Sequence, residues 1–431
     1  MKLLAQRRQH GDGFVFIQLM PLAALLGGTA LLLLGSGLLT TLLAVRGGIE
    51  GFSEPFMGLM GSLFFAGFLI GTHFAPRLIR RVGHVRAFAF FTSAVACSVL
   101  LHDLAVSPWI WAPVRLATGI AMVGLYAIVE SWLNSQAAAQ SRARVFAVYM
   151  AVNLGSLALA QQLLHAGDAA GHILFVLAAL LICAAVMPVA ATRLSQPVLD
   201  SVAPPALRTL YRKAPIAFDA AFASGLAMGA FWGLGAVWAD RSGLGTAGVA
   251  AFMSATIVGG ALFQWPLGRW SDRHDRGRVI TVVAFLAAAS ALLPMFAAPY
   301  GVDAAAAAGF LYGGFAFALY PLAMARMVDR LEPHEVLAGG SGLLRVHGIG
   351  AAIGPLVAGV AMNILGPMAL PLWCALTQGL LAVLTSSLLR GLPGVIALQT
   401  RFMPMVRTHT TAFELAGRAP ADPDTPTKET T

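Results

Sequence analysis

Long apolar spans recur along the whole chain, and they constrain its fold more than any other feature. A helix needs about 20 apolar residues to cross the ~30 Å hydrocarbon core of a bilayer. Twelve spans reach about this length, near 17–45, 54–75, 87–105, 108–134, 145–166, 169–191, 215–239, 246–267, 279–299, 304–327, 338–364 and 367–390. The sequence therefore predicts an all-α membrane protein with twelve transmembrane helices.

Composition and charge exclude the soluble classes. Of the 431 residues, 58% are hydrophobic and 11% are charged, whereas soluble domains are about 45–50% apolar and about 25% charged. The net charge of +9 lies in short loops between apolar spans, which argues against a nucleic-acid partner. Cys97, Cys183 and Cys374 lie inside apolar runs, so we expect core residues rather than disulfides or metal ligands. The first span is too long for a cleaved signal peptide.

A polar stretch divides the spans into two groups of six. Residues 192–214 contain charges and the pair Pro204-Pro205, which is typical of a linker. We therefore expect an N-terminal six-helix bundle at 1–191, a cytoplasmic linker at 192–214, a C-terminal six-helix bundle at 215–390 and a partly disordered cytoplasmic tail at 391–431. The tail is rich in Pro, Thr and charges.

Basic residues alternate from one loop to the next. If the N-terminus is inside, the inner segments hold 24 of the 28 Lys and Arg residues, and the outer loops hold only Arg46 and Arg241. Cytoplasmic loops carry such an excess. The sequence therefore predicts that both termini are cytoplasmic. The two remaining basic residues, Arg115 and Arg345, fall at membrane depth.

One loop carries a recognisable motif. The segment 268–278, which includes Gly268, Asp272 and Arg273, resembles the Gly-x-x-x-Asp-Arg-x-Gly-Arg-Arg loop of the major facilitator superfamily. Together with Leu319-Tyr320-Pro321 and Gly354-Pro355, it is similar to the YcaD-type subgroup of bacterial facilitators. The resemblance implies two pseudo-symmetric six-helix bundles around a central cavity, alternating access and a place in the bacterial cytoplasmic membrane.

The chain also departs from the family pattern. In the first half the equivalent loop reads Arg80-Arg81-Val82-Gly83, and Arg80 stands where the motif has its aspartate. In the second half Asp275 replaces the motif glycine. The antiporter Gly-Pro signature belongs in helix 5, whereas here Gly354-Pro355 lies in helix 11. The resemblance therefore implies transport without implying proton antiport.

Charged residues at membrane depth are the first candidates for a site, because each costs about 2.5–3.5 kcal/mol. Arg115 matches the superfamily's helix-4 arginine, which implies a substrate or proton site; the alternative is snorkelling to the interface. Asp219 could bind substrate or cap its helix. Arg345 could attract an anion or face an acceptor on helix 2. His347 could titrate or simply be hydrogen-bonded.

Glu130 lies near the cytoplasmic end of helix 4. Since the first-half motif lacks its aspartate, we expect Glu130 to be the counter-charge to the basic loop between helices 2 and 3. A substrate or proton site and a solvated residue at the helix end are the alternatives. The predicted cytoplasmic gate comprises Arg77, Arg80, Arg81, Gly83, Glu130, Gly268, Asp272 and Arg273.

Uncharged polar residues complete the predicted cavity. Asn153, Gln264 and Tyr320 lie inside apolar spans, where most such residues bond neighbouring helices. Helix 2 has Gly67-x-x-x-Gly71 and helix 11 holds seven glycines, which predict close helix packing.

The interpretation is a secondary transporter, acting as a monomer in the lipid bilayer, that moves a small amphipathic or anionic organic solute. We favour export and coupling to an ion, with a proton as the candidate. A transporter-derived sensor or scaffold that binds without translocating is the alternative. No nucleotide-binding loop or catalytic motif appears, which argues against an enzyme, and no cofactor is expected.

Overall fold

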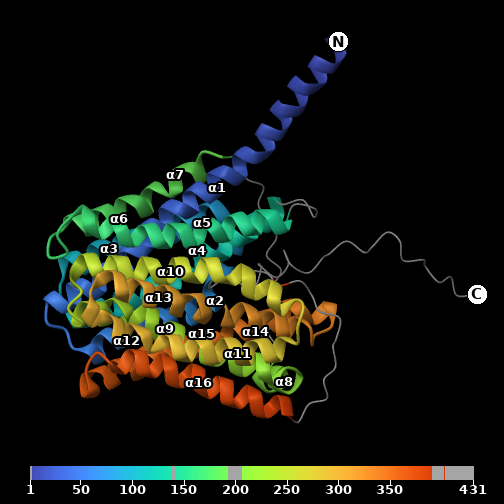
Figure 1. Cartoon of the computed structure of the whole chain (residues 1–431). Helices are drawn as coiled ribbons and strands as arrows, with labels where there is room; N and C mark the ends of the chain where they lie inside the picture. Colours follow the sequence, from blue (N-terminus) through green and yellow to red (C-terminus); the bar gives the residue numbers. More distant parts are fainter. Residues whose placement is uncertain (1, 137–141, 193–205, 391–401, 403–431) are drawn as a thin grey trace, which may run out of the picture.

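The computed structural model describes residues 2–136, 142–192, 206–390 and Phe402. These residues form helices and turns, with no β-strand among them. The long helices lie alongside one another in a single bundle, and the N-terminal part of α1 extends beyond it (Figure 1). The elements are α1 (Lys2–Ile49), α2 (Glu54–Val82), α3 (His84–Leu104), α4 (Pro108–Gln136), α5 (Arg142–Gln162), η1 (Leu163–Ala166), α6 (Ile173–Ala184), α7 (Val186–Ala190), α8 (Leu207–Lys213), α9 (Pro215–Arg241), α10 (Gly245–Ser271), α11 (Arg276–Ala291), α12 (Leu293–Ala297), η2 (Ala298–Tyr300), α13 (Val302–Ala316), α14 (Leu319–Val328), η3 (Pro333–Glu335), α15 (Val336–Leu365) and α16 (Ala369–Arg390).

Within the described ranges, twelve segments are long and apolar enough to cross a membrane, which confirms the predicted number. Six of them precede the polar stretch (α1–α7, the first set) and six follow it (α9–α16, the second set). Three spans contain two α-helices each, namely the sixth, the ninth and the tenth, and the fifth and ninth spans end in the short 3-10 helices η1 and η2. The division into two domains stays a prediction. Most of the predicted linker and tail lies outside the described residues, although α8 falls within the linker range.

The ends of α2 follow from local sequence. Pro55 occupies the first turn, where its missing N–H leaves no bond unmade, and Glu54 places a carboxylate near the positive end of the helix dipole. The helix ends at Gly83, whose φ of 82° is a conformation that side chains other than glycine rarely adopt. The motif glycine therefore allows the sharp turn from α2 into α3.

The tenth span is broken at Phe317 and Ala318 because of Pro321. Proline has no N–H to donate to the carbonyl four residues earlier, and that carbonyl belongs to Phe317. The chain consequently leaves the α-helical pattern after Ala316 and re-enters it at Leu319. Tyr320 follows directly after the break. Discontinuous helices are a recurrent place for binding sites in transporters.

Helices α2, α9 and α15 meet where small residues allow their backbones to touch. A side-chain carbon added at Gly58 would lie 2.3 Å from the carbonyl oxygen of Pro355, and one added at Gly61 would lie 3.0 Å from Gly233. Lipid offers no hydrophobic drive for helices to associate, so they depend on such close contact. On α15 itself, a carbon added at Gly354 would lie 2.1 Å from the carbonyl oxygen of Leu226 on α9, and one added at Gly359 would lie 2.6 Å from that of Glu54 on α2. These glycines of the eleventh span therefore form packing faces, as predicted.

The same device joins α2 to α4. A carbon added at Gly67 would lie 2.1 Å from the carbonyl oxygen of Leu116, and one added at Gly119 would lie 2.0 Å from that of Phe64. Both distances are far below any normal contact. This packing fixes α4, which carries Arg115, against α2.

Several polar contacts between the two sets lie toward the end of the bundle where α2 begins. Arg241 on α9 forms an ion pair with Glu54 on α2 at 3.1 Å. The Ser62 hydroxyl accepts from the backbone N–H of Leu356 at 3.0 Å, and the Gln162 amide donates to Ser254 at 2.7 Å. By the predicted topology, this is the periplasmic end.

The topology prediction can be checked with a reporter that is active only in the periplasm. Fused to the C-terminus, it should give no signal, because the excess of basic loops keeps that end cytoplasmic. Inserted after Gly243, in the turn between α9 and α10, it should be active. A strong signal from the C-terminal fusion would contradict the predicted orientation.

The close packing of α4 can be tested with a matched pair of alanine variants. Gly119→Ala should lower stability by about 1–3 kcal/mol, because the methyl group meets a backbone carbonyl that cannot give way. Gly155→Ala on α5 is the control, since no atom lies within 4 Å of an added carbon there. Thermal unfolding of the purified proteins measures both. Equal melting temperatures for the two variants would contradict the packing argument.

Candidate functional site

A small cavity lies between the two sets, in the middle of the bundle. Its volume is about 60 Å³ for the centres of water-sized molecules, and one water needs about 10–15 Å³. In this conformation it therefore has room for a few water molecules but not for an organic solute. The lining comes from α1, α2, α4, α5 and α9: Ser36, Gly37, Leu39, Thr40, Gly61, Phe64, Phe65, Arg115, Thr118, Met122, Tyr126, Leu157, Trp232 and Gly233.

Arg115 is the one charged residue in that lining. Its side chain is buried, with 6% of the residue exposed. The guanidinium carbon lies 4.5 Å from the centre of the Phe64 ring, and Nη2 donates to the Thr40 hydroxyl at 3.3 Å. Among the described residues, no carboxylate lies within ion-pair distance of it. Arg115 thus points a cation into the cavity with an aromatic ring and one hydroxyl as its neighbours.

The rest of the lining gave no signal in the sequence. Phe64, Phe65 and Trp232 are aromatic residues in apolar helices, and such residues usually pack against other helices or lipid. Thr40 sits in an apolar run and bonds its own helix at Ser36. Only the three-dimensional packing of α1, α2 and α9 shows that these side chains surround Arg115.

A second polar group surrounds Glu130, whose side chain is completely buried. The Tyr149 hydroxyl on α5 donates to the Glu130 carboxylate at 3.4 Å. Asn153 lies beside Tyr149, although neither of its amide atoms reaches hydrogen-bond geometry. Tyr320 on α14 lies within electrostatic range of the Glu130 carboxylate. This group therefore draws together candidates from both sets.

His347 extends this group on the side of the second set. Its ring centre lies 4.5 Å from that of Tyr320, and its Nδ1 lies 3.3 Å from the carbonyl oxygen of Ala221. The Tyr320 hydroxyl has no hydrogen-bond partner in the described part of the chain. The structure thus brings Tyr320 into contact with His347, and Glu130 into contact with Tyr149, and none of the four candidates Tyr320, His347, Glu130 and Asn153 lines the Arg115 cavity.

The remaining candidates lie elsewhere. Asp219 is half-buried as the fifth residue of α9 and does not cap it, because Ala214 occupies that position and no side chain bonds the helix end. Gln264 is buried on α10. Arg345 contacts His73, which is the acceptor on helix 2 that the sequence allowed for.

Glu130 and the basic loop after α2 differ in exposure. Arg77, Arg80 and Arg81 are exposed, and Arg77 donates to the carbonyl oxygen of His73 at 3.2 Å. Glu130, by contrast, is turned inward toward Tyr149. The pairing of Glu130 with this loop therefore stays a prediction.

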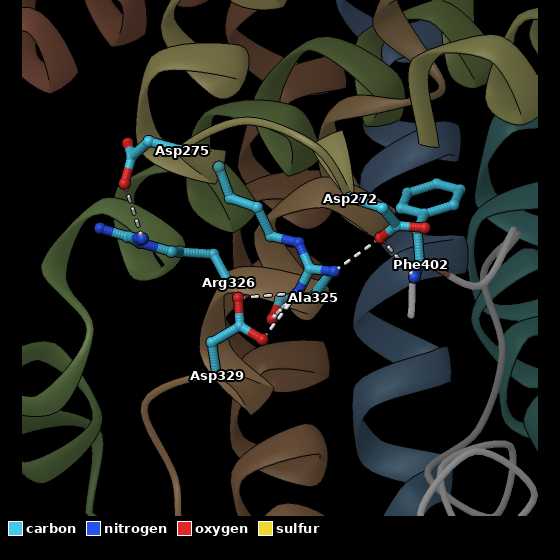
Figure 2. Close-up of polar contacts among 7 residues, drawn as sticks. Asp272, Asp275, Ala325, Arg326, Asp329 and Phe402 are labelled. Carbon is cyan, nitrogen blue, oxygen red and sulfur yellow. Dashed lines mark hydrogen bonds and ion pairs between the residues drawn. The ribbon is translucent and has the colours of Figure 1, made fainter. Parts of the chain in front are cut away.

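The motif of the second set forms a charge cluster at the junction of α10, α11 and α14 (Figure 2). Arg276 is fully buried, and its Nη1 contacts both carboxylate oxygens of Asp329 at 2.7 Å and the Ala325 carbonyl oxygen at 3.0 Å. Its Nη2 donates to Asp272 at 2.8 Å. The arginine that engages the motif aspartate is thus Arg276, whereas Arg273 is exposed.

Two further contacts tie neighbouring segments to this cluster. Asp275 caps α11 by accepting the N–H of Arg278, and its other oxygen lies 3.4 Å from Arg326 on α14. The backbone N–H of Phe402 donates to Asp272 at 2.8 Å, while its ring fills the space above Gly268 (Figure 2). Sequence reasoning missed all three contacts: Arg276 stands in the motif, directly after the position of its second glycine, but was not singled out, and Asp329 and Phe402 lie outside the motif.

Comparison with known proteins identifies the family. A sequence profile described as Major Facilitator Superfamily matches residues 25–336, well over half of the chain. The chain belongs to the major facilitator superfamily. It is therefore a multi-pass membrane transporter.

Bacterial relatives support the resemblance to the YcaD-type subgroup. The chain is 28% identical over 353 residues to YcaD of Salmonella paratyphi A (strain ATCC 9150 / SARB42), which is named an uncharacterized MFS-type transporter; the match covers 81% of this chain and 91% of that protein. A second YcaD, from Salmonella newport (strain SL254), is 28% identical over 347 residues and is covered to 89%. The predicted family is thus confirmed, and so is the predicted resemblance to YcaD.

Solved structures show the same fold. The nucleoside transporter NupG superposes with a TM-score of 0.71 at 14% identity, covering 86% of this chain and 99% of NupG. The human organic anion transporter MFSD10 superposes with a TM-score of 0.59 at 16% identity, covering 85% of this chain and 99% of that one. At these identities the likeness establishes the fold alone.

The charge cluster makes a clear prediction about stability. Arg276→Gln should cost about 3–5 kcal/mol, because it leaves the buried Asp329 carboxylate without its cation. Arg273→Gln, which changes an exposed arginine three residues away, is the matched control and should stay within about 0.5 kcal/mol of the wild type.

The double variant Arg276→Gln/Asp329→Asn should recover part of the loss, since it removes the unpaired charge as well. Thermal unfolding of the purified proteins measures all three. If Arg276→Gln melts together with Arg273→Gln, the cluster does not stabilise this end of the bundle.

Proposed function

We propose that this protein is a secondary transporter for a small organic anion with an aromatic or otherwise apolar body. Arg115 carries the proposal, since it places a buried cation in a cavity between the two sets with no acidic partner among the described residues. A charge at membrane depth costs about 2.5–3.5 kcal/mol and needs compensation. An anionic substrate supplies the compensating charge only while it is bound.

The form of the cavity supports the rest of the substrate class. A guanidinium binds a carboxylate through two parallel hydrogen bonds, which fixes the orientation of the anion. The neighbouring walls are Phe64, Phe65 and Trp232, and such aromatic surfaces suit the apolar part of a ligand. Tyr126 and Thr118 add hydroxyl groups at the edge.

Transport requires this cavity to widen, because its present volume does not admit an organic solute. We propose that the first and second sets move as two bodies around it, with both termini in the cytoplasm. Export is the direction and an ion is the energy source that we favour. The substrate class agrees with that of MFSD10, which is named an organic anion transporter, but Arg115 carries the argument.

Ligand-induced stabilisation tests the substrate class. In a thermal-shift assay on purified protein, 2-naphthoate should stabilise the wild type more than its neutral amide does, because only the carboxylate pairs with Arg115. A ligand at 100 times its Kd adds about 2.7 kcal/mol. Arg115→Gln should weaken carboxylate binding by at least about tenfold, which corresponds to one lost charged hydrogen bond. Arg115→Lys should fall between the two.

The matched control is Arg269→Gln. Arg269 also stacks on an aromatic ring, at 4.6 Å from Trp265, but it is exposed and lies outside the cavity. The Arg269→Gln variant should bind 2-naphthoate as the wild type does. The anion proposal would be overturned if 2-naphthoate stabilised Arg115→Gln as much as the wild type. It would also be overturned if the neutral amide stabilised the wild type as much as the carboxylate does. Uptake into vesicles containing the purified protein separates transport from binding alone.

A further inference from the structure

A histidine and an arginine meet across the interface between the two sets. His73 on α2 and Arg345 on α15 lie with Nε2 and Nη2 3.3 Å apart. Both stand inside membrane spans, nine residues before the end of α2 and nine after the start of α15. Among the polar contacts between α2 and α15, this one lies nearest to the predicted cytoplasmic end.

The surroundings of Nδ1 determine which ring nitrogen of His73 carries the proton. Nδ1 lies 3.2 Å from the Thr72 hydroxyl oxygen and 3.4 Å from the Leu69 carbonyl oxygen. The Thr72 hydroxyl gives its own hydrogen to the Leu69 carbonyl at 2.6 Å, so both neighbours can only accept from Nδ1. The proton therefore sits on Nδ1, and Nε2 of the neutral ring offers its lone pair to Arg345.

Protonation of His73 is incompatible with this contact. A proton on Nε2 uses the lone pair that accepts from Arg345, and it places an imidazolium N–H against a guanidinium N–H. Two donors and two positive charges would then face each other at 3.3 Å. We propose that His73 is a proton-binding site of this transporter, and that its protonation separates α2 from α15 at this end.

Among the charged and titratable groups on the described helices around α2, Arg345 determines how the α2–α15 contact responds to protonation of His73. Among the described residues, His73 bonds no other side chain from a neighbouring helix. The charged and titratable groups on the helices packed against α2 are Arg345 and His347 on α15; Arg115, Tyr126 and Glu130 on α4; Asp219, Asp240 and Arg241 on α9; and His84, Arg86, Cys97, His102 and Asp103 on α3. On α2 itself, Arg77 contacts only the backbone carbonyl of His73.

The packing of α2 on α15 shows what the proton would release. Three contacts join the two helices along their length. Gly359 of α15 meets Glu54 of α2, Pro355 meets Gly58, and Gly348 meets Leu69. The first two lie between backbones that glycine brings together, whereas the His73 contact depends on a lone pair. Loss of the proton forms this bond and holds the helices together, and gain of the proton breaks it. Low pH therefore favours the separated arrangement.

Spin labels on α2 and α15 test the proposal without any substrate. Arg81→Cys near the end of α2 and Val336→Cys at the start of α15 provide the label sites, with the exposed Cys97 and Cys183 replaced by serine. Histidine changes charge between about pH 5 and pH 8. Lowering the pH across this range should change the ratio of separated to closed populations by about tenfold, which matches one lost hydrogen bond to a charged group.

Three variants decide the outcome. His73→Gln keeps an acceptor but cannot titrate, so the closed population should persist at both pH values. His73→Lys is always charged and should give the separated population at both. His172→Gln is the control, because His172 is also exposed and faces a charged group, Asp103 at 2.8 Å, but within the first set. It should keep the wild-type pH response.

Two results would overturn the proposal. One is a wild type whose distances do not change with pH, and the other is a pH response that survives undiminished in His73→Gln. The proposal rests on the movement of the two sets but not on the anion site. If Arg115→Gln abolishes carboxylate binding while the pH response is absent, only the proton site fails. If His73 behaves as expected while the carboxylate does not bind, only the anion site fails.

Discussion

Close approach of helix backbones is the constraint on which this structure depends. A helix in lipid satisfies its own backbone hydrogen bonds but gains no hydrophobic drive toward its neighbours. In this protein, glycine supplies the contact: Gly67 and Gly119 bring α2 onto α4, and Gly58 brings α2 onto Pro355 of α15. The positions of the polar side chains follow from these contacts, since each candidate residue is placed by the helix that carries it.

The buried and half-buried arginines differ in what compensates their charge, and this difference separates structure from function. Arg276 lies between two carboxylates, so its charge is balanced permanently within the second set. Arg345 faces His73, whose Nε2 accepts a hydrogen bond only while the ring is neutral. Arg115 faces a ring and a hydroxyl beside a cavity, with no carboxylate among its described contacts. The charge of Arg276 is thus balanced without a ligand, whereas in our proposal the charge of Arg115 is balanced by a bound anion.

Sequence reasoning reached the fold because span length and loop charge are local properties. The twelve spans and the packing role of the α15 glycines follow from residues that are neighbours in the chain. The site was predictable only where a charge stood out, as at Arg115. Its aromatic walls were not, because Phe64 and Trp232 look like any other membrane-helix residues until α2 and α9 are placed together.

Motif position was a poor guide to contact for a similar reason. Asp272 and Arg273 were singled out from the loop motif, but the arginine that pairs with Asp272 is Arg276, which lies one helical turn further along the same motif, at the start of α11. Likewise, His73 carries no motif, and its significance depends on the rotation of α15, which determines where Arg345 lies. How far a helix is rotated about its own axis is decided by tertiary packing. In so hydrophobic a chain, the pattern of apolar residues does not define this rotation.

The contact of Phe402 with the loop after α10 has a practical consequence. Its backbone N–H occupies one oxygen of Asp272, and its ring covers Gly268. Shortening the chain at Arg390, a natural choice when a membrane protein is prepared for crystallisation, would remove both. The motif aspartate would then face solvent or a detergent head group on that side. A trimmed protein is therefore a chemically altered transporter at its most recognisable loop, and its activity should be compared with that of the full chain before the two are treated as equivalent.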